Sequence, residues 1–297
     1  MIATSCPTRP LSKKYNLLLL LAFFALSPAM NATAATKMLL LNPARAIFTD
    51  RTRSVEVHVG NIAKEPISYA VDVVTMRKDK NGDLREVSSE SPEEAAVRNM
   101  IRFSPRRATI EPGKRQVVKL MVRKPADLAP GEYQTRLRFT PLPSEQAVAA
   151  ATPAATEKAT VDLNLLVTST IPIIIQNGDV RSELTPVSLT LKELPGAKTT
   201  LAADVAFARS GSASAFGNVT LQFIPAGATK TARTIGQAQG LAVYLPDKER
   251  TLTVPLTGVT RQELGAGTIR VTFQPSAGVL DQRGTTAQER SKDFPAR

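Results

Sequence analysis

The chain contains very little cysteine, histidine and aromatic residue. Its 297 residues include one cysteine, one histidine, four tyrosines, ten phenylalanines and no tryptophan. The single cysteine is Cys6, close to the start, so the rest of the chain cannot form an internal disulfide. No cysteine and histidine cluster has the spacing of metal ligands. We therefore expect no cysteine nucleophile, no metal and no cofactor.

The usual patterns of catalytic sites are also missing. His58 lies between Val57 and Val59, and strand alternation points it away from the apolar face, as a solvated side chain. The segment "GSASAFG" (211–217) lacks the glycine offsets of a nucleophile elbow. No glycine-rich loop of the phosphate-binding kind is present. These absences predict a protein that is not an enzyme.

The first 35 residues have the three regions of a secretory signal peptide. Lys13 and Lys14 form a basic region, "NLLLLLAFFAL" (16–26) is a short apolar core, and "NATAA" (31–35) ends in small residues. We expect cleavage near Ala34 or Ala35 and export through the inner membrane. An N-terminal membrane anchor is the alternative, but the apolar core is short for a span. No later segment reaches 18 continuous apolar residues, so we expect no membrane span.

The chain is strongly basic, with a formal net charge of +12. The first 35 residues carry three cations and no acidic residue, so the remainder keeps +9. Such a protein could meet anionic surfaces, acidic proteins or nucleic acid. The basic residues are spread along the chain, and few aromatic residues are present to stack on bases. We therefore expect no nucleic-acid partner.

Alternating apolar residues predict an all-β fold. Val55, Val57 and Val59 share one face of a strand, and Asn81-Gly82 is a typical hairpin turn. Similar short runs, separated by glycine and proline, continue beyond Gly178, and only "SPEEAAVRNM" (91–100) is typical of a helix. About seven strands in each half predict two β-sandwiches, residues 36–176 and 177–297. The polar end "DQRGTTAQERSKDFPAR" is expected to be frayed.

The segment "ATVDLNLLVTSTIPIIIQNG" (159–178) predicts an unusually long strand. Its alternate residues are apolar except for one serine: Val161, Leu163, Leu165, Val167, Ser169, Ile171, Ile173 and Ile175. An ordinary strand has about 5–6 residues. The polar, alanine-rich segment before it (144–159) is expected to be a mobile loop. A long apolar edge strand is an aggregation hazard, so its presence indicates a use.

Four motifs in a fixed order resemble the PapD-like periplasmic chaperones of bacterial pilus assembly. They are "NPARAIF" (42–48), "VEVHVGN" (55–61), "FSPRRATIEPGKRQVVKL" (103–120) and "LAPGEYQTRLRFTPLP" (128–143). The resemblance covers about residues 40–180, and "GLAVYLPDKERTLTVPL" (240–256) is similar to the second domain of a divergent branch.

The resemblance implies two immunoglobulin-like sandwiches set at an angle, in a protein of the periplasm. Such a chaperone lends the edge strand of its first domain to a pilus subunit that lacks its last strand, and an outer-membrane usher receives the subunit. The donated side chains would be Val161, Leu163, Leu165 and Val167. The end of this strand, with Ile171, Pro172 and Ile173, would lie in the first domain or at the domain junction. The alternative is that residues 161–167 face their own sandwich.

The resemblance also implies an anchor for the terminal carboxylate of the subunit. In the family, an arginine in the first strand and a lysine in the donor strand hold this group, and Arg45 matches the arginine. Pro172 stands where the lysine is expected, and it carries neither charge nor backbone donor. Arg45 alone, a further cation such as Arg181 or Lys119, or a different anchor all stay open.

Two other functions stay open beside the chaperone. A structural pilus subunit or adhesin would also be exported and immunoglobulin-like, but it should carry a donor segment directly after the signal peptide. A hydrolase or carbohydrate-binding sandwich is the third. Whether the free protein pairs with a second copy of itself also stays open.

Overall fold

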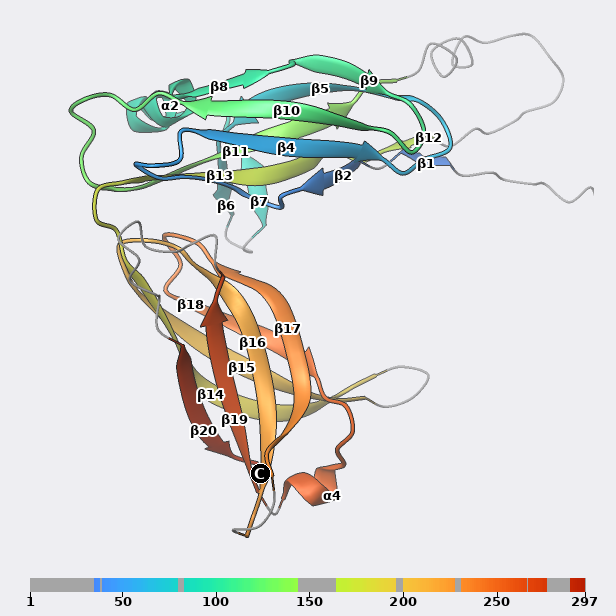
Figure 1. Ribbon diagram of the computed structural model, residues 1–297, viewed down its shortest axis with the longest axis vertical. Helices are drawn as coiled ribbons and strands as arrows, with labels where there is room; N and C mark the ends of the chain where they lie inside the picture. Colours follow the sequence, from blue (N-terminus) through green and yellow to red (C-terminus); the bar gives the residue numbers. More distant parts are fainter. Residues whose placement is uncertain are drawn as a thin grey trace, which may run out of the picture.

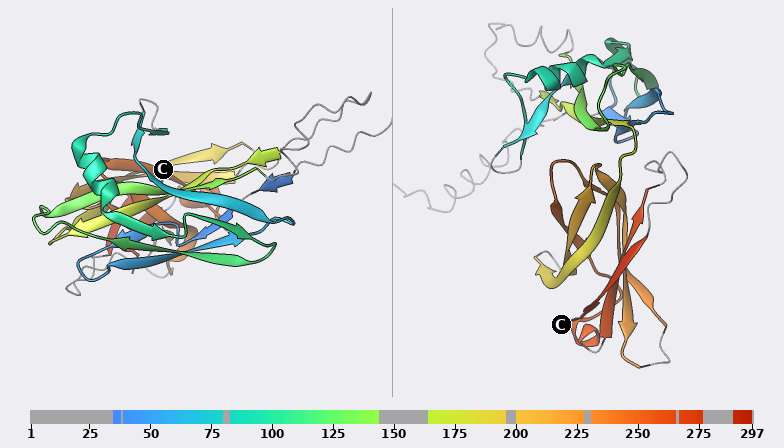
Figure 2. Two further views of the ribbon diagram at one scale, coloured as in Figure 1. Left: turned by 90° about the horizontal axis from the view of Figure 1, so that it is seen from above. Right: turned by 90° about the vertical axis from the view of Figure 1, so that its left-hand side faces the viewer.

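The computed structural model describes residues 35–37, 39–79, 83–143, 164–195, 200–227, 231–265, 267–276 and 289–296. Strands dominate this part of the chain, which confirms the all-β prediction. Two β-sandwiches follow one another, and their long axes are turned relative to each other (Figures 1 and 2). Residues 1–34 of the predicted signal peptide, the segment 144–159 and the Asn81-Gly82 turn lie outside the described residues. No helix in the described ranges has the length and apolar character of a membrane span.

The first sandwich combines a four-stranded and a five-stranded sheet. The four-stranded sheet has the order β2 (Leu39–Asn42), β4 (Ser54–Asn61), β10 (Arg115–Val122) and β8 (Ile101–Ser104). The five-stranded sheet has the order β3 (Ala46–Phe48), β13 (Ser169–Asn177), β11 (Gly131–Pro141), β5 (Ile67–Val74) and β9 (Arg107–Ile110). The first strand is shared, because β2 pairs with β4 while β3 runs parallel to β13. This is the strand order of an immunoglobulin-like sandwich.

The core of the first sandwich follows from strand alternation. Val57 and Val59 are buried while His58 between them is exposed, as the sequence predicts. Leu137 and Phe139 of β11 enter the same core from the other sheet. The helix α2 (Pro92–Asn99) covers one end, and a capping box between Ser91 and Glu94 satisfies the first backbone amides.

Two short strand pairs lie outside the two main sheets. The strands β6 (Met76–Lys78) and β7 (Leu84–Glu86) pair antiparallel on either side of the predicted hairpin turn. The strands β1 (Ala35–Lys37) and β12 (Asn164–Leu166) pair parallel, and β12 directly precedes β13 along the chain.

The second sandwich has a core of its own, centred on Phe207, Leu221 and Phe273. One sheet has the order β14 (Ser182–Leu194), β15 (Thr200–Gly211) and β18 (Glu249–Pro255). The other has the order β17 (Arg233–Val243), β16 (Ala215–Pro225), β19 (Gly267–Pro275) and β20 (Arg290–Pro295), and the short helix α4 (Arg261–Leu264) precedes β19.

The strand β20 corrects the expectation of a frayed C-terminal end for residues 289–296, whereas residues 281–288 and 297 lie outside the described residues. Residues 290–295 pair with β19 along their whole length. Phe294 and Ala296 are buried in the second core. The polar residues 290–293 come before Phe294 and are exposed or partly exposed on this edge strand, so the polar composition alone was misleading.

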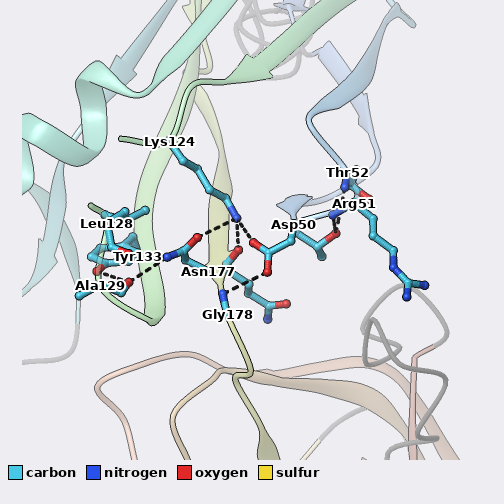
Figure 3. A network of polar contacts seen from close by, with 11 residues as sticks. Asp50, Arg51, Thr52, Lys124, Leu128, Ala129, Tyr133, Asn177 and Gly178 are labelled. Atoms are coloured by element: carbon cyan, nitrogen blue, oxygen red, sulfur yellow. Dashed lines mark hydrogen bonds and ion pairs between the residues drawn. The ribbon is translucent and has the colours of Figure 1, made fainter. Parts of the chain in front are cut away.

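A lysine holds the end of β13 where the chain leaves the first sandwich (Figure 3). Lys124 Nζ donates to Asp50 Oδ1 at 2.6 Å and to the carbonyl of Gln176 at 2.5 Å. The other oxygen of Asp50 accepts from the amide of Gly178 at 3.2 Å. Gly178 has φ +70°, a left-handed conformation that favours glycine, and the chain turns there toward β14.

The same corner is closed by side chains that bond the backbone before β11. Asn177 Nδ2 donates to the carbonyls of Leu128 and Ala129 at 2.7 and 3.1 Å. Tyr133 Oη also donates to Ala129 O at 2.9 Å, as in the tyrosine corner of immunoglobulin-like domains. The side chains of Asp50, Lys124, Tyr133 and Asn177 therefore fix the start of the connection to the second sandwich.

A buried serine joins the two sandwiches. Ser214 of the second sandwich is fully buried, and its hydroxyl donates to Glu132 Oε1 at 2.5 Å. It also accepts from Gln134 Nε2 at 2.9 Å and from the amide of Leu245 at 3.1 Å. The amide of Ser214 donates to the other oxygen of Glu132 at 3.0 Å. An ion pair between Lys78 and Asp247 adds a second contact across the junction.

We expect Asp50→Asn to lower the free energy of unfolding by about 0.5–1 kcal/mol at pH 7, the size of a partly exposed ion pair. The hydrogen bond from Lys124 holds the pKa of Asp50 below its ordinary value. Its contribution is therefore present above pH ~4 and is lost as the pH falls through the folded-state pKa. Urea unfolding at pH 7 and pH 3 measures this, with exposed Asp127→Asn as control. An equal effect of Asp50→Asn at both pH values would contradict it.

We expect Ser214→Ala to loosen the junction, because three hydrogen bonds of the hydroxyl are lost and Glu132 keeps only part of its partners. No cysteine follows Cys6, so two engineered cysteines at exposed Lys119 and Gln262 can carry spin labels. The distance distribution between the labels should broaden in Ser214→Ala. The exposed Ser210→Ala is the control, and identical distributions in both variants would count against the role of Ser214.

Candidate binding site at the edge of the first sandwich

The two faces of β13 point to two different cores. Ile171, Ile173 and Ile175 are buried in the core of the first sandwich. Ile174, on the opposite face, is also fully buried, but it packs with residues of the junction. These are Ile47 of β3 and, from the second sandwich, Phe216, Ala242 and Tyr244. The strand β13 is thus held on both faces.

One edge of β13 is only partly paired. The strand β11 bonds one edge along its whole length, from Asn177 to Ser169. On the other edge, β3 pairs only with Ile173, Ile174 and Ile175. In the described ranges no strand pairs with this edge between Ser169 and Pro172. The backbone there is available to an added strand.

The predicted donor residues lie before this open edge. Val161 and Leu163 are outside the described residues. Leu165 belongs to β12, where its backbone lies opposite Thr36 of β1. Val167 lies between β12 and β13 and is half-buried, and Thr168 after it is exposed. The role of these four residues as donated side chains stays a prediction.

Arg45 lies at the junction of the two sandwiches. It directly precedes β3, and its Cζ is 4.4 Å from the ring centroid of Phe216. The ring of Phe216 in turn meets that of Tyr244 edge to face, with centroids 5.3 Å apart. A guanidinium stacked on an aromatic face keeps its N–H groups free to bind in its own plane.

The cation near Pro172 is Arg136, and neither Lys119 nor Arg181, the two considered from the sequence, takes this place. Lys119 is exposed on β10 of the four-stranded sheet, and Arg181 pairs with Asp179 at 2.9 Å. Arg136 of β11 lies directly opposite Pro172. On the other side of Pro172, the parallel register pairs Ile173 with Ala46, the residue after Arg45.

Arg136 is half-buried, and it lies close enough to Tyr244 of the second sandwich for an electrostatic interaction. Burial lowers the pKa of its guanidinium, and the nearby Tyr244 partly opposes this shift. The sequence carried part of this signal, because alternation in "GEYQTRLRF" puts Arg136 on the face opposite Leu137. The register between β11 and β13, which brings Arg136 to Pro172, joins segments about 36 positions apart and has no local signal.

In the described ranges no group of histidine, cysteine or carboxylate residues could hold a metal ion. The site consists of the open edge of β13, the guanidinium groups of Arg45 and Arg136, and the rings of Phe216 and Tyr244. Such a set of groups suits the backbone and carboxylate of a polypeptide.

Comparison with known proteins finds similarity only among solved structures. No sequence-family description matches the chain, and no curated protein matches it. The CupB2 chaperone of Pseudomonas aeruginosa is 11% identical, and the match covers 86% of this chain and 99% of that one with a TM-score of 0.41. The E. coli chaperone DraB is 12% identical over 88% and 99% of the two chains, with a TM-score of 0.41.

A third match comes from the complex of the SafA pilin with the SafB chaperone of Salmonella enterica. It is 15% identical and covers 88% of this chain and 99% of that one, with a TM-score of 0.39. Each of these three matches covers most of this chain, and each comes from a solved structure of a bacterial chaperone, alone or in complex.

Proposed function

We propose that this protein is a periplasmic chaperone that binds pilus subunits by strand addition and delivers them to an usher at the outer membrane. The segment 161–172 would complete the open sandwich of a subunit and shield its core until assembly. The protein would act by binding alone, without catalysis or a cofactor. The subunit would exchange the chaperone strand for a strand of the next subunit.

The observation that carries the proposal is the partly unpaired edge of β13. This strand is the last of its sandwich, and its edge from Ser169 to Pro172 has no partner in the described ranges. The apolar alternation of residues 161–167 continues the same strand direction toward the N-terminus. Backbone hydrogen bonds along such an edge supply affinity for any extended segment, and alternate side chains supply fit.

The energetics of strand addition are consistent with stable but reversible capture. Burial of each donated apolar side chain in a subunit pocket would contribute about 1.5–3 kcal/mol. Ordering the donor segment and joining two molecules oppose much of this gain. A further anchor at Arg45 would fix the position of the bound strand, because a guanidinium fork matches a carboxylate.

The structure of the N-terminal segment disfavours a pilus subunit. A subunit needs a free donor segment at its start and an open sandwich. In this chain, β2 is paired in the four-stranded sheet and β3 is paired in the five-stranded sheet of the first sandwich. Each sandwich also has its last strand, β13 and β20. Two closed sandwiches favour the chaperone over the subunit.

The proposal is tested by capture from the native periplasm. The tagged protein, expressed with its own signal sequence, should be recovered in the periplasmic fraction together with an immunoglobulin-like pilus subunit in equal amount. Mass spectrometry identifies the co-purified chain. Recovery of the protein alone, from cells that produce the pilus, would contradict the proposed function.

We expect Leu165→Glu to abolish recovery of the subunit while the chaperone stays folded. A carboxylate cannot enter an apolar pocket without a large desolvation cost. The matched control is Asn164→Glu, which adds the same charge one residue earlier in β12. Circular dichroism checks the fold of both variants. Equal subunit recovery in the two variants would count against donation of Leu165.

We expect Arg45→Ala to weaken subunit capture by about tenfold or more, the effect of one lost hydrogen bond to a charged group. Arg45→Lys keeps the charge but loses the planar fork, and it should recover only part of the affinity. The yield of co-purified subunit in a pull-down series against rising competitor measures both. Wild-type yields in Arg45→Ala would remove Arg45 from the site.

A further inference from the structure

The four-stranded sheet of the first sandwich (Figure 1) has an outer face that carries exposed cations and exposed apolar side chains together. Its strand β10 sends Val118 and Leu120 into the first core. Because side chains alternate along a strand, Arg115, Lys119 and Met121 point to the opposite side, and all three are exposed.

The strand register places an apolar side chain beside a guanidinium at each end of this face. Arg115 lies opposite Gly60, and Gly60 lies opposite Leu40 of β2, which is 53% exposed. At the other end, Met121, which is 49% exposed, lies opposite Arg102 of β8. The two ends are about 20 Å apart, from the rise of six residues along β10. The surface that carries Leu40, Arg102, Arg115, Lys119 and Met121 is called the basic face below.

The cations of the basic face lack carboxylate partners. Arg102, Arg115 and Lys119 form no ion pair within the part of the chain that the structure describes. Glu56 of β4 is the one acidic residue that alternation places on this face in the described ranges, and it lies opposite Lys119. Three cations against one carboxylate leave the face positive.

Two further exposed cations border the end with Met121. Arg53 directly precedes β4, and Arg123 directly follows β10. The carbonyl of Arg53 accepts from the amide of Val122 at 3.1 Å, so the two segments lie side by side. Among the described residues neither guanidinium has an ion-pair partner. Met121 is therefore bordered by cations on several sides.

Outward cations of the second sandwich are neutralised by carboxylates on neighbouring strands. Arg270 Nε donates to Asp293 Oδ1 at 2.8 Å, and Lys192 Nζ lies 2.7 Å from Asp204 Oδ1. The same arrangement is possible on any antiparallel sheet. The basic face does not use it, so its charge is left for a partner.

A partner that fits the basic face is anionic and broad, and it has an apolar layer just behind its charges. An anionic bilayer has these properties, because phosphate groups pair with guanidinium groups and acyl chains lie below them. Nucleic acid offers phosphates but no such apolar layer. A protein interface usually has a continuous apolar centre. Leu40 and Met121 are instead separated by polar and charged side chains, which suits shallow contacts at separate points.

We propose that the basic face docks this protein on a membrane surface that contains anionic phospholipids. The cations lie at the phosphate groups, and Leu40 and Met121 reach the headgroup region. The open edge of β13 belongs to the other sheet of the sandwich, so docking leaves it accessible. The inference rests on the proposed function for the location of the protein between two membranes, but binding to the bilayer requires no captured subunit.

The first experiment measures flotation of the full mature protein with lipid vesicles. We expect binding to vesicles of phosphatidylglycerol and phosphatidylethanolamine but not to vesicles of phosphatidylcholine. Binding should fall steeply between about 0.1 M and about 1 M salt, where the Debye length drops from about 10 Å to about 3 Å. Equal binding to both kinds of vesicle, or none to either, would overturn the inference.

The second experiment separates the basic face from net charge. The triple variant Arg115→Gln, Lys119→Gln and Arg123→Gln should weaken vesicle binding on the order of a hundredfold, about fivefold for each cation. The control triple variant removes the same charge elsewhere, from three exposed cations: Arg107→Gln, Lys248→Gln and Arg261→Gln. It should lose far less, and circular dichroism checks the fold of both. Equal losses in the two variants would contradict docking through this face.

The third experiment places a reporter on the face. No cysteine follows Cys6, so Met121→Cys can carry a single polarity-sensitive dye. Its emission should shift to the blue with the anionic vesicles, while the same dye at Ser188→Cys, exposed on the second sandwich, should not respond. Identical responses at the two sites would remove Met121 from the membrane contact.

The tests distinguish other partners and the two proposals. Poly-glutamate or duplex DNA that binds through the three cations, without any binding to anionic vesicles, would replace the membrane by another partner and overturn the inference. If no subunit is captured but the vesicle results are as expected, the chaperone function is wrong and the docking stands. If a subunit is captured and the triple variant binds vesicles as wild type, the docking is wrong.

Discussion

The structure depends on the way β13 is fixed on both of its faces. Its odd residues, Ile171, Ile173 and Ile175, anchor it in the first core, and Ile174 anchors it in the junction with the second sandwich. A strand buried on both faces cannot rotate or slip without exposing one apolar set. Its backbone edge is therefore presented in one fixed orientation, which an added strand requires.

The junction gives this edge its chemical surroundings. The bonds between Ser214 and Glu132, and the network of Lys124 with Asp50, hold the end of β13 against the second sandwich. They keep Phe216 and Tyr244 beside Arg45 and Arg136. The rigid first sandwich and the fixed position of the second sandwich thus together determine which side chains surround the open edge of β13, where a chain end could bind.

Much of this architecture follows from local sequence signals. Strand alternation predicted the all-β fold, the buried Val57 and Val59, and the exposed His58 between them. The segment 91–100 predicted the helix α2. The strand β20 was missed because its polar composition hides a single core residue, Phe294. Alternation finds strands best where most inward positions are large and apolar.

The site itself was less predictable than the fold. Arg45 was found through a motif, but Arg136 becomes relevant only through the register of β11 with β13. The partnership of Ser214 with Glu132 joins positions 82 residues apart and belongs to the packing of two sandwiches. Long-range pairing of this kind is decided by the whole core, and a short stretch of sequence does not contain it.

The most direct test of the account is hydrogen exchange along residues 161–172 in the free protein and in its complex with a captured subunit. Strand addition predicts that the amides of this segment that are not bonded to β1 or β11 exchange quickly when free and become strongly protected in the complex, at alternate positions as in a β-ladder. Unchanged exchange in this segment, with new protection confined to another surface, would contradict the account.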